Sequence, residues 1–268
     1  MDFTLHNGVD MPGLGLGLFD VAPARTASVV RCALACGYRL FDTAALYENE
    51  RGVGEALRNS GLSRRDIFVT TKVHNLDQGY DATLKAFDES LDALGLEYID
   101  LYLIHFPLSE TRLETWRALT KLYKEKRCRA IGVSNFMVHH LRELEEFSEL
   151  LPTVNQVEFH PYLFNHELLS YCEERGIHLQ AYSPLARGAQ FDDPKLVELA
   201  GHYHRTPAQI LLRWSLEHGC SVIPKSIRPS RIRENSQIFD FDLEADDVAT
   251  MDSFSCDLRM CWDPTEIP

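Results

Sequence analysis

YRLFDTAALYENERGVGEALRNS, residues 38–60, joins a short apolar run to a helical one. The first part, 38–43, has the length and composition of a buried strand, and 48–60 has apolar residues at helical spacing. Asp42 stands where the strand ends, and Tyr47 stands in the short connection to the helix. The stretch therefore predicts a strand–helix unit with a carboxylate and a phenol at the carboxyl end of the strand.

The same unit recurs along the whole chain. Apolar runs at 14–19, 38–43, 66–72, 98–105, 128–134, 152–159, 177–183 and 221–225 each precede a helical segment, at 23–36, 48–60, 80–94, 111–126, 137–146, 165–175, 194–218 and 229–235. Continuous apolar strands separated by amphipathic helices indicate parallel strands that are buried on both faces. Eight such pairs predict a closed (β/α)8 barrel, with residues 1–268 forming one domain.

Both ends of the chain add to this barrel. The segment FTLHNGVDMP (3–12) carries an Asn7-Gly8 turn signal between two short runs, which predicts a hairpin that closes the floor of the barrel. After about residue 245 we expect one last helix and a short irregular tail.

Composition and charge exclude several classes of function. With 27 Lys and Arg against 40 Asp and Glu, the net charge is −13, which argues against nucleic acid as a partner. No apolar run is long enough to span a membrane, and the first ten residues do not resemble a secretory signal. The seven cysteines are scattered and form no CxxC pair, so we expect reduced thiols in the cytoplasm. We further expect a monomer that binds a small molecule.

Polar residues stand at nearly every predicted strand end, and in a barrel of this kind such residues form the active site. Lys72 follows five apolar or neutral residues, so its ammonium should be buried and should need a counter-charge. Asp42 on the neighbouring strand is the natural partner. A phenol beside that ammonium, Tyr47, should have a lowered pKa and act as a proton donor, and His105 could hold a substrate oxygen. For each residue alone, the capping of a loop or helix is an equally good interpretation.

These residues and their neighbours resemble the aldo-keto reductases. The resemblance covers essentially the whole chain, in order. The chain resembles in particular short-loop members such as diketogluconate reductases and prostaglandin F synthase-like reductases. The motifs that carry it are FDTAALYENE (41–50), TTK (70–72), DLYLIHFP (100–107), AIGVSNF (130–136), NQVEFHP (155–161), AYSPLARG (181–188) and IPKS with RIRENSQIFDF (223–241).

The resemblance implies NADPH-dependent reduction of a carbonyl group by a tetrad of Asp42, Tyr47, Lys72 and His105. It also implies a set of cofactor-binding residues from the later strand ends. They are Ser134, Asn135 and Gln156 at the nicotinamide carboxamide, Tyr182 stacked on the nicotinamide, Ser183, Leu185, Arg187 and Gly188 at the pyrophosphate, Lys225, Ser226 and Arg231 at the adenosine 2′-phosphate, and Glu234 and Asn235 near the adenine.

The group predicted at the 2′-phosphate also follows from elementary chemistry. Two cations and a hydroxyl close together at the eighth strand end, Lys225, Ser226 and Arg231, form a phosphate site within an acidic protein. Such a site favours NADPH over NADH. The alternative is that both cations are solvated surface charges.

The expected substrate site departs from that of many relatives. Phe19 and Phe106 stand where many relatives carry Trp, and the segment PLSET (107–111) is short. We therefore expect an open site, lined by Phe19, Tyr47, His105, Phe106 and Trp262, that takes small aldehydes, dicarbonyls or keto-sugars. Trp262 either folds over this site or packs against the barrel.

Other signals are weaker. GLGLG (13–17) lacks the GxGxxG spacing of a dinucleotide loop. Glu158 and His160 belong to no metal-ligand set and are interpreted as structural hydrogen-bonding residues. The pair His139-His140 is expected at the surface. Two rival functions stay open: an NADPH-binding regulatory barrel with little turnover, and a metal-dependent barrel hydrolase.

Overall fold

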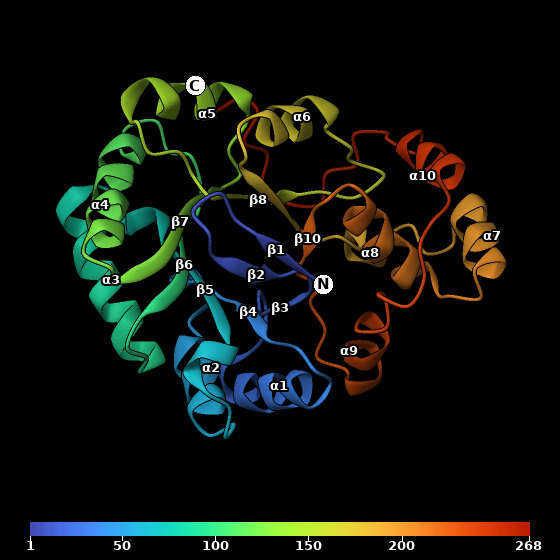
Figure 1. Cartoon of the computed structure of the whole chain (residues 1–268), viewed down its shortest axis with the longest axis horizontal. Helices are drawn as coiled ribbons and strands as arrows, with labels where there is room; N and C mark the ends of the chain where they lie inside the picture. Colours follow the sequence, from blue (N-terminus) through green and yellow to red (C-terminus); the bar gives the residue numbers. More distant parts are fainter.

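The computed structural model describes residues 1–268 and shows a barrel of eight parallel strands surrounded by helices (Figure 1). Neighbouring strands pair in chain order from β3 to β10. A parallel bridge between Leu14 and Val222, with the Val222 N–H donating to the Gly13 carbonyl at 2.9 Å, joins the two edge strands and closes the ring. The predicted (β/α)8 fold is confirmed.

The strands of the barrel all run in the same direction. They are β3 (Gly15–Gly17), β4 (Leu40–Asp42), β5 (Phe68–Val73), β6 (Ile99–Ile104), β7 (Cys128–Ser134), β8 (Val154–Glu158), β9 (His178–Tyr182) and β10 (Ser221–Val222). The helices are α1 (Pro23–Ala35), α2 (Glu50–Arg58), α3 (Tyr80–Leu94), α4 (Arg112–Lys124), α5 (Val138–Phe147), α6 (His166–Glu174), α7 (Pro194–His202), α8 (Pro207–Glu217), α9 (Pro229–Asn235) and α10 (Ala245–Asp252). Four short 3₁₀ turns are η1 (Ala45–Tyr47), η2 (Arg64–Asp66), η3 (Asn75–Asp77) and η4 (Ala186–Gly188).

The segment predicted as one helical stretch from 194 to 218 is two helices, α7 and α8. Thr206 begins α8 as an N-cap: its hydroxyl accepts the Gln209 N–H at 3.3 Å, and the Gln209 side chain accepts the Thr206 N–H at 3.0 Å. Pro207 follows at the first helical position, where its missing N–H costs nothing. The stretch therefore carries its own break, because a proline cannot continue α7.

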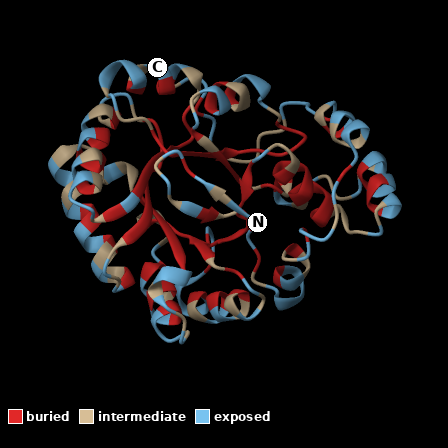
Figure 2. Ribbon diagram, viewed as in Figure 1, coloured by how far each residue is buried: buried red, intermediate tan, exposed pale blue.

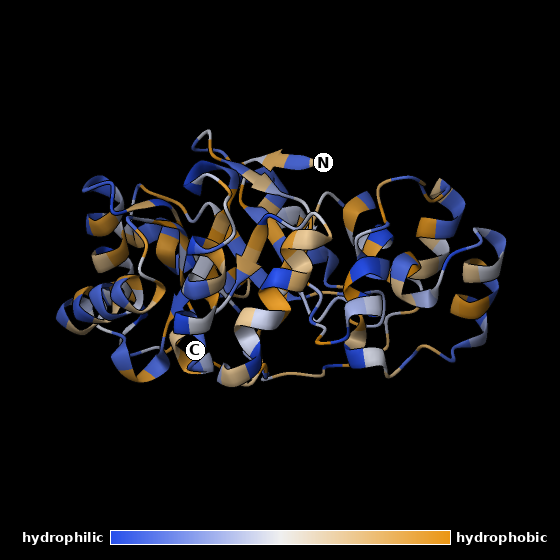
Figure 3. Ribbon diagram, turned by 90° about the horizontal axis from the view of Figure 1, so that it is seen from below, coloured by the Kyte–Doolittle hydropathy of each residue, from blue (hydrophilic) through white to orange (hydrophobic).

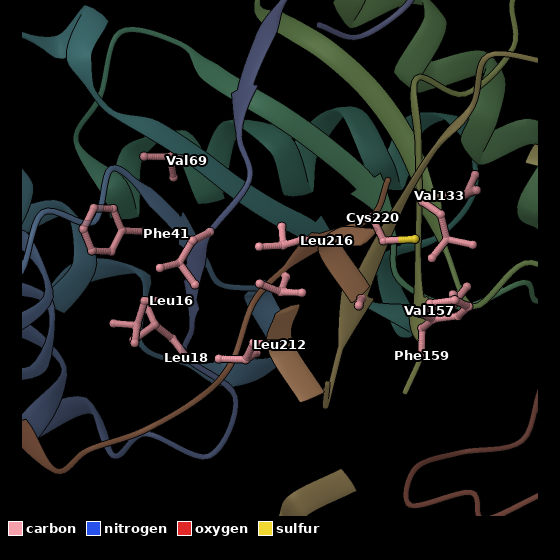
Figure 4. Close-up of a cluster of buried hydrophobic side chains, with 14 of the residues drawn as sticks. Leu16, Leu18, Phe41, Val69, Val133, Val157, Phe159, Leu212, Leu216 and Cys220 are labelled. Carbon is pink, nitrogen blue, oxygen red and sulfur yellow. The ribbon is translucent and has the colours of Figure 1, made fainter. Parts of the chain in front are cut away.

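The strands bury their two faces in two different cores. Leu40, Phe68 and Leu101 belong to a cluster inside the barrel, whereas Phe41 and Val69, one residue further on, pack in the layer between sheet and helices. Figure 4 shows part of that outer layer, and Figure 2 shows that the strands and the inner faces of the helices are buried. This alternation is the pleat of the strands, and it decides which side chains point into the barrel.

A hairpin of β1 (Asp2–Thr4) and β2 (Asp10–Pro12) closes the floor of the barrel, as predicted. Leu5 and Met11 extend from it into the inner cluster and are almost completely buried. The connection is longer than a two-residue turn: the Leu5 N–H donates to the Val9 carbonyl at 2.9 Å, so Asn7-Gly8 lies at the tip of a five-residue loop.

Two glycines of the GLGLG segment allow close packing inside the barrel. A Cβ on Gly15 would lie 2.1 Å from Leu40 Cδ2, and a Cβ on Gly17 would lie 2.6 Å from the Ile223 carbonyl oxygen. This packing explains the glycine-rich segment without a dinucleotide loop.

The two ends of the chain lie at opposite ends of the barrel, as Figure 3 shows with the N-terminus above and the C-terminus below. The residues after α10 run across the end where the strands finish. None of the helices combines the length and the apolar character that crossing a lipid bilayer requires.

Candidate active site

The pleat places Asp42 and Lys72 inside the barrel at its open end. Side chains alternate between the two faces of a strand, so residues two or four positions apart share a face. Asp42 therefore points to the same side as Leu40, and Lys72 to the same side as Phe68, which is the inside of the barrel. Both side chains are buried, Lys72 completely. The sequence therefore required them to meet, because β4 and β5 are neighbours.

Lys72 and Asp42 form a buried ion pair, with Lys72 Nζ 2.6 Å from Asp42 Oδ1. The ammonium also donates to the Thr43 carbonyl at 3.0 Å, and the Gln156 amide donates to Asp42 Oδ2 at 2.6 Å. Burial raises the pKa of Asp42 and lowers that of Lys72, and the contact between them opposes both changes. The pair thus holds one ammonium in place with its charge balanced.

Tyr47 ends the turn η1 and points its hydroxyl toward this pair, with Oη 3.4 Å from Lys72 Nζ. The prediction of a lowered pKa for this phenol is wrong for the cofactor-free protein. Burial, with Asp42 as the next cause, raises the pKa of Tyr47 well above 10. The charge of Lys72 is largely balanced by Asp42, so in the resting site its attraction for a phenolate is outweighed by burial and by the Asp42 charge. Tyr47 consequently stays protonated and can donate a hydrogen bond or a proton.

His105 lies just beyond β6, with its ring edge-to-face against Tyr47 at a centroid distance of 5.6 Å. The side chain is buried, and its Nδ1 has no hydrogen-bond partner. Burial, with a smaller effect of Lys72, holds the pKa of His105 well below 6.5. The ring is therefore neutral and has one N–H to offer to an oxygen.

The four residues predicted at the nicotinamide lie together beside the tetrad. Asn135 donates to the His105 carbonyl at 2.9 Å and accepts the Tyr182 hydroxyl at 2.7 Å. Ser134 donates to the Gln156 carbonyl at 2.8 Å, and the Gln156 amide is bonded to Asp42 as described above. The cluster orients the tetrad, and its contacts with a carboxamide stay a prediction.

The segment predicted at the pyrophosphate, Ser183 to Gly188, is a loop with unusual backbone angles. Ser183, Ala186 and Arg187 have φ of 45°, 45° and 51°, a region that residues other than glycine seldom adopt. Gly188 has φ 79°, and Leu185 is half-buried. Such strain is maintained where a loop is shaped for a ligand, which fits the predicted role.

The residues predicted at the adenosine phosphate lie on and just before α9. Arg231 has no carboxylate within 4 Å, and Lys225 has only Asp20, at 3.8 Å. One cation without a carboxylate partner and one with only a distant partner, beside Ser226, fit a phosphate group in a protein of net charge −13. Glu234 accepts the Thr206 hydroxyl at 2.8 Å and is thereby anchored at the start of α8, and Asn235 is buried.

The predicted substrate wall is aromatic. Phe19 packs edge-on against Tyr47 at a centroid distance of 5.3 Å, and Phe106 packs against Trp262 at 6.4 Å. Trp262 is 56% exposed, so it is not buried against the barrel, and it contacts Phe106. Its contact with a substrate stays a prediction.

The comparisons with known proteins agree with this arrangement. Residues 13–255 match the model of the aldo/keto reductase family. The chain belongs to that family. A glyoxal reductase of Bacillus subtilis is 50% identical over 98% of this chain and 96% of its own length, and a 9,11-endoperoxide prostaglandin H2 reductase of Trypanosoma cruzi is 48% identical over 97% and 94%. The crystal structure of a Gox0644 variant in complex with NADPH superimposes with a TM-score of 0.95 at 40% identity, covering 99% of this chain and 98% of that one.

This aldo/keto reductase is an NADP-dependent oxidoreductase that acts on carbonyl groups. No group of three His, Cys, Asp or Glu side chains is arranged to hold a metal ion. Glu158 and His160 are hydrogen-bonded to each other, as predicted, with Nε2 3.2 Å from Oε1.

One residue that supports the reductase site, Asn49, was not predicted from the sequence. Asn49 accepts the Thr43 hydroxyl at 2.6 Å and donates to the carbonyls of Leu18 and Val21, and these bonds fix the loop that carries Tyr47. Only its position among the first residues of a helix was visible in the sequence.

The prediction that both His139 and His140 lie at the surface is wrong for His140. That ring is buried, accepts the Met137 N–H and contacts the Ile267 carbonyl at 2.8 Å, because the tail of the chain returns over α5. Nothing in the sequence around His140 signals this long-range contact.

Proposed function

We propose that the protein reduces small aldehydes, dicarbonyls or keto-sugars with NADPH, and that Tyr47 is the proton donor. The observation that carries the proposal is the position of a protonated phenol 3.4 Å from a charge-balanced ammonium and beside a neutral imidazole. The similarity to a glyoxal reductase supports dicarbonyls among the substrates.

The residues divide the work of carbonyl reduction among them. Bound NADPH supplies the hydride. As negative charge develops on the carbonyl oxygen, Tyr47 and His105 donate hydrogen bonds to it. Preplaced donors of this kind lower the activation free energy by roughly 3 kcal/mol each. Tyr47 then gives up its proton, and the ammonium of Lys72 stabilises the phenolate that results.

The supporting residues keep this geometry fixed. Asp42 balances Lys72 in the resting site, and Gln156 holds Asp42 from the opposite side. Because Asp42, Lys72 and His105 are buried and Tyr47 is half-buried, the developing charges are weakly screened and the preplaced donors act strongly. Asn135 positions His105 through the carbonyl of that residue.

The cations near α9 support a preference for NADPH over NADH. The two cofactors differ by one phosphate on the adenosine ribose, so only NADPH can use a charge-assisted bond to Arg231 or Lys225. The residues that would hold this group are Lys225, Ser226 and Arg231.

A spectrophotometric screen of NADPH oxidation tests the proposal. Aldehydes, dicarbonyls and keto-sugars are each supplied with NADPH and, separately, with NADH. We expect turnover with several small carbonyls and faster turnover with NADPH at equal, subsaturating concentrations. Tight NADPH binding with no turnover of any of these substrates would instead support the regulatory barrel.

A further inference from the structure

The segment 256–262 is held along the open end of the barrel by a regular series of backbone contacts. The amides of Cys256 and Leu258 both donate to the Tyr162 carbonyl, at 3.2 and 3.0 Å. The series ends at Glu158, the last residue of β8, on the rim of the candidate active site.

Glu158 binds the tail through both of its carboxylate oxygens. Oε1 accepts the Met260 N–H at 2.7 Å, and Oε2 accepts the Cys261 N–H at 3.0 Å. His160 Nε2 lies 3.2 Å from Oε1, and the side chains of both residues are completely buried. Burial raises the pKa of Glu158, but the bonds from His160, Met260 and Cys261 outweigh it and lower the pKa below its ordinary value. Three donors on one buried carboxylate make a rigid anchor.

The anchored residue Cys261 and the next residue, Trp262, face the two halves of the site. Cys261 Sγ accepts a bond from Arg187 at 3.2 Å and lies 3.6 Å from Ser183 Oγ, both in the strained cofactor loop. Trp262, the next residue, packs edge-on against Phe106 in the substrate wall. The bonds from the Met260 and Cys261 amides to the Glu158 carboxylate therefore determine the position of Trp262 in the substrate wall.

We propose that Glu158 is a positioning residue that sets the substrate range of the enzyme by anchoring the Met260–Cys261 backbone and hence Trp262. This inference rests on the proposed function only in its kinetic part. The Glu158 side chain bonds to His160 and to the tail, and it makes no hydrogen bond to the tetrad or to Tyr182, its neighbour in the β8–β9 pairing. Its effect on the reaction therefore passes through the tail.

The variant Glu158→Gln tests the anchor because an amide of the same shape turns one acceptor into an N–H group that faces another N–H. We expect hydrogen exchange of the Met260 and Cys261 amides to accelerate at least about tenfold, since a charge-assisted bond is lost. Amides of β6 serve as the internal reference and should exchange at the wild-type rate.

The kinetic arm compares a small and a bulky substrate with NADPH. For phenylglyoxal we expect KM to rise about fivefold to tenfold with kcat preserved, because an aromatic substituent loses the contact with Trp262. For glyoxal, which is too small to reach that ring, kcat and KM should stay within about twofold of wild type. Glu89→Gln, on the exposed face of α3, is the matched control and should change neither measurement.

Each outcome decides the proposal. Unchanged exchange at Met260 and Cys261 in Glu158→Gln overturns the anchor, and an equal loss of kcat for both substrates overturns the specificity role in favour of general damage to the site. If the wild-type protein reduces neither substrate, the proposed function fails, while the exchange comparison still decides whether Glu158 anchors the tail.

Discussion

Lys72 carries the only positive charge that the structure places against the Tyr47 hydroxyl, and that charge is shared with Asp42 at 2.6 Å. An ammonium close to a phenol would by itself lower the pKa of the phenol. Here the ammonium is paired with Asp42, so it does not lower the pKa of the resting Tyr47. Burial then dominates and keeps the proton on Tyr47. The lysine is therefore important for the phenolate formed during the reaction and not for the resting phenol.

Removal of the counter-charge tests this balance. Asp42→Asn leaves the buried ammonium without a carboxylate, and we expect the free energy of unfolding to fall by about 3 kcal/mol or more. Urea denaturation measures it. The double variant Asp42→Asn/Lys72→Met removes both charges and should recover much of the loss while staying inactive. A double variant less stable than the single one would show that the ion pair is not what Asp42 stabilises.

Arg231 tests the cofactor preference at the same scale. Arg231→Ala removes a charge-assisted bond to the 2′-phosphate, so the Kd for NADPH should rise about tenfold to a hundredfold. The Kd for NADH should stay within about twofold, because NADH has no such phosphate. Fluorescence titration gives both constants. Arg233→Ala, two residues further along α9, is the control, and equal weakening of both cofactors by Arg231→Ala would contradict the assignment.

At the scale of elements, strand and helix positions were predictable because the barrel strands are buried on both faces and most helices on one, α8 being buried all round. The site followed from the same logic, since parallel strands bring Asp42, Lys72 and His105 to one end. What the periodicity could not supply was the break between α7 and α8, for which the cap Thr206 and Pro207 were the available signal. The course of the tail was left open between two alternatives, because the contacts that hold it join residues about 100 positions apart.

Thr206 links one of these elements to the predicted cofactor site. Its hydroxyl caps α8 and donates to Glu234 at 2.8 Å on α9. Thr206→Ala should lower the free energy of unfolding by about 1 kcal/mol and weaken NADPH binding slightly through Glu234. Thr206→Ser retains the hydroxyl and should behave like wild type in denaturation and titration. Loss of stability in both variants would point to the methyl group instead of the cap.

At the scale of the whole molecule, the barrel separates stability from function along its axis. The hairpin and the inner cluster of apolar side chains close one end, and the tetrad and the tail occupy the other. The two chain ends lie on these opposite sides (Figure 3). The inner cluster ends where Asp42 and Lys72 begin, so the polar site rests on an apolar floor. This separation explains why loops and tail can vary the substrate while the fold persists.

Buried histidines predict the response of the whole molecule to acid. Burial lowers the pKa of His178 to about 4, and its Nε2 accepts the Ser221 N–H at 3.2 Å. Below pH 6.5 the His178 imidazole binds a proton in the unfolded chain but stays neutral in the folded chain. The free energy of unfolding therefore falls as the pH drops from 6.5 to about 4. For His178 this loss amounts to about 3 kcal/mol.

Denaturation at a series of pH values checks this expectation. His178→Gln keeps an acceptor for the Ser221 N–H but cannot be protonated, so its stability should fall less steeply between pH 6.5 and 4. Identical slopes for the variant and the wild type would assign the acid response to other groups.

The central claim is that Tyr47 gives the proton to the substrate oxygen, and Tyr47→Phe tests it most directly. The variant loses only a hydroxyl, so steady-state reduction of glyoxal should slow by about a hundredfold to ten-thousandfold, while the Kd for NADPH stays within about twofold. Reduction of glyoxal by Tyr47→Phe at a rate close to that of wild type would contradict the claim.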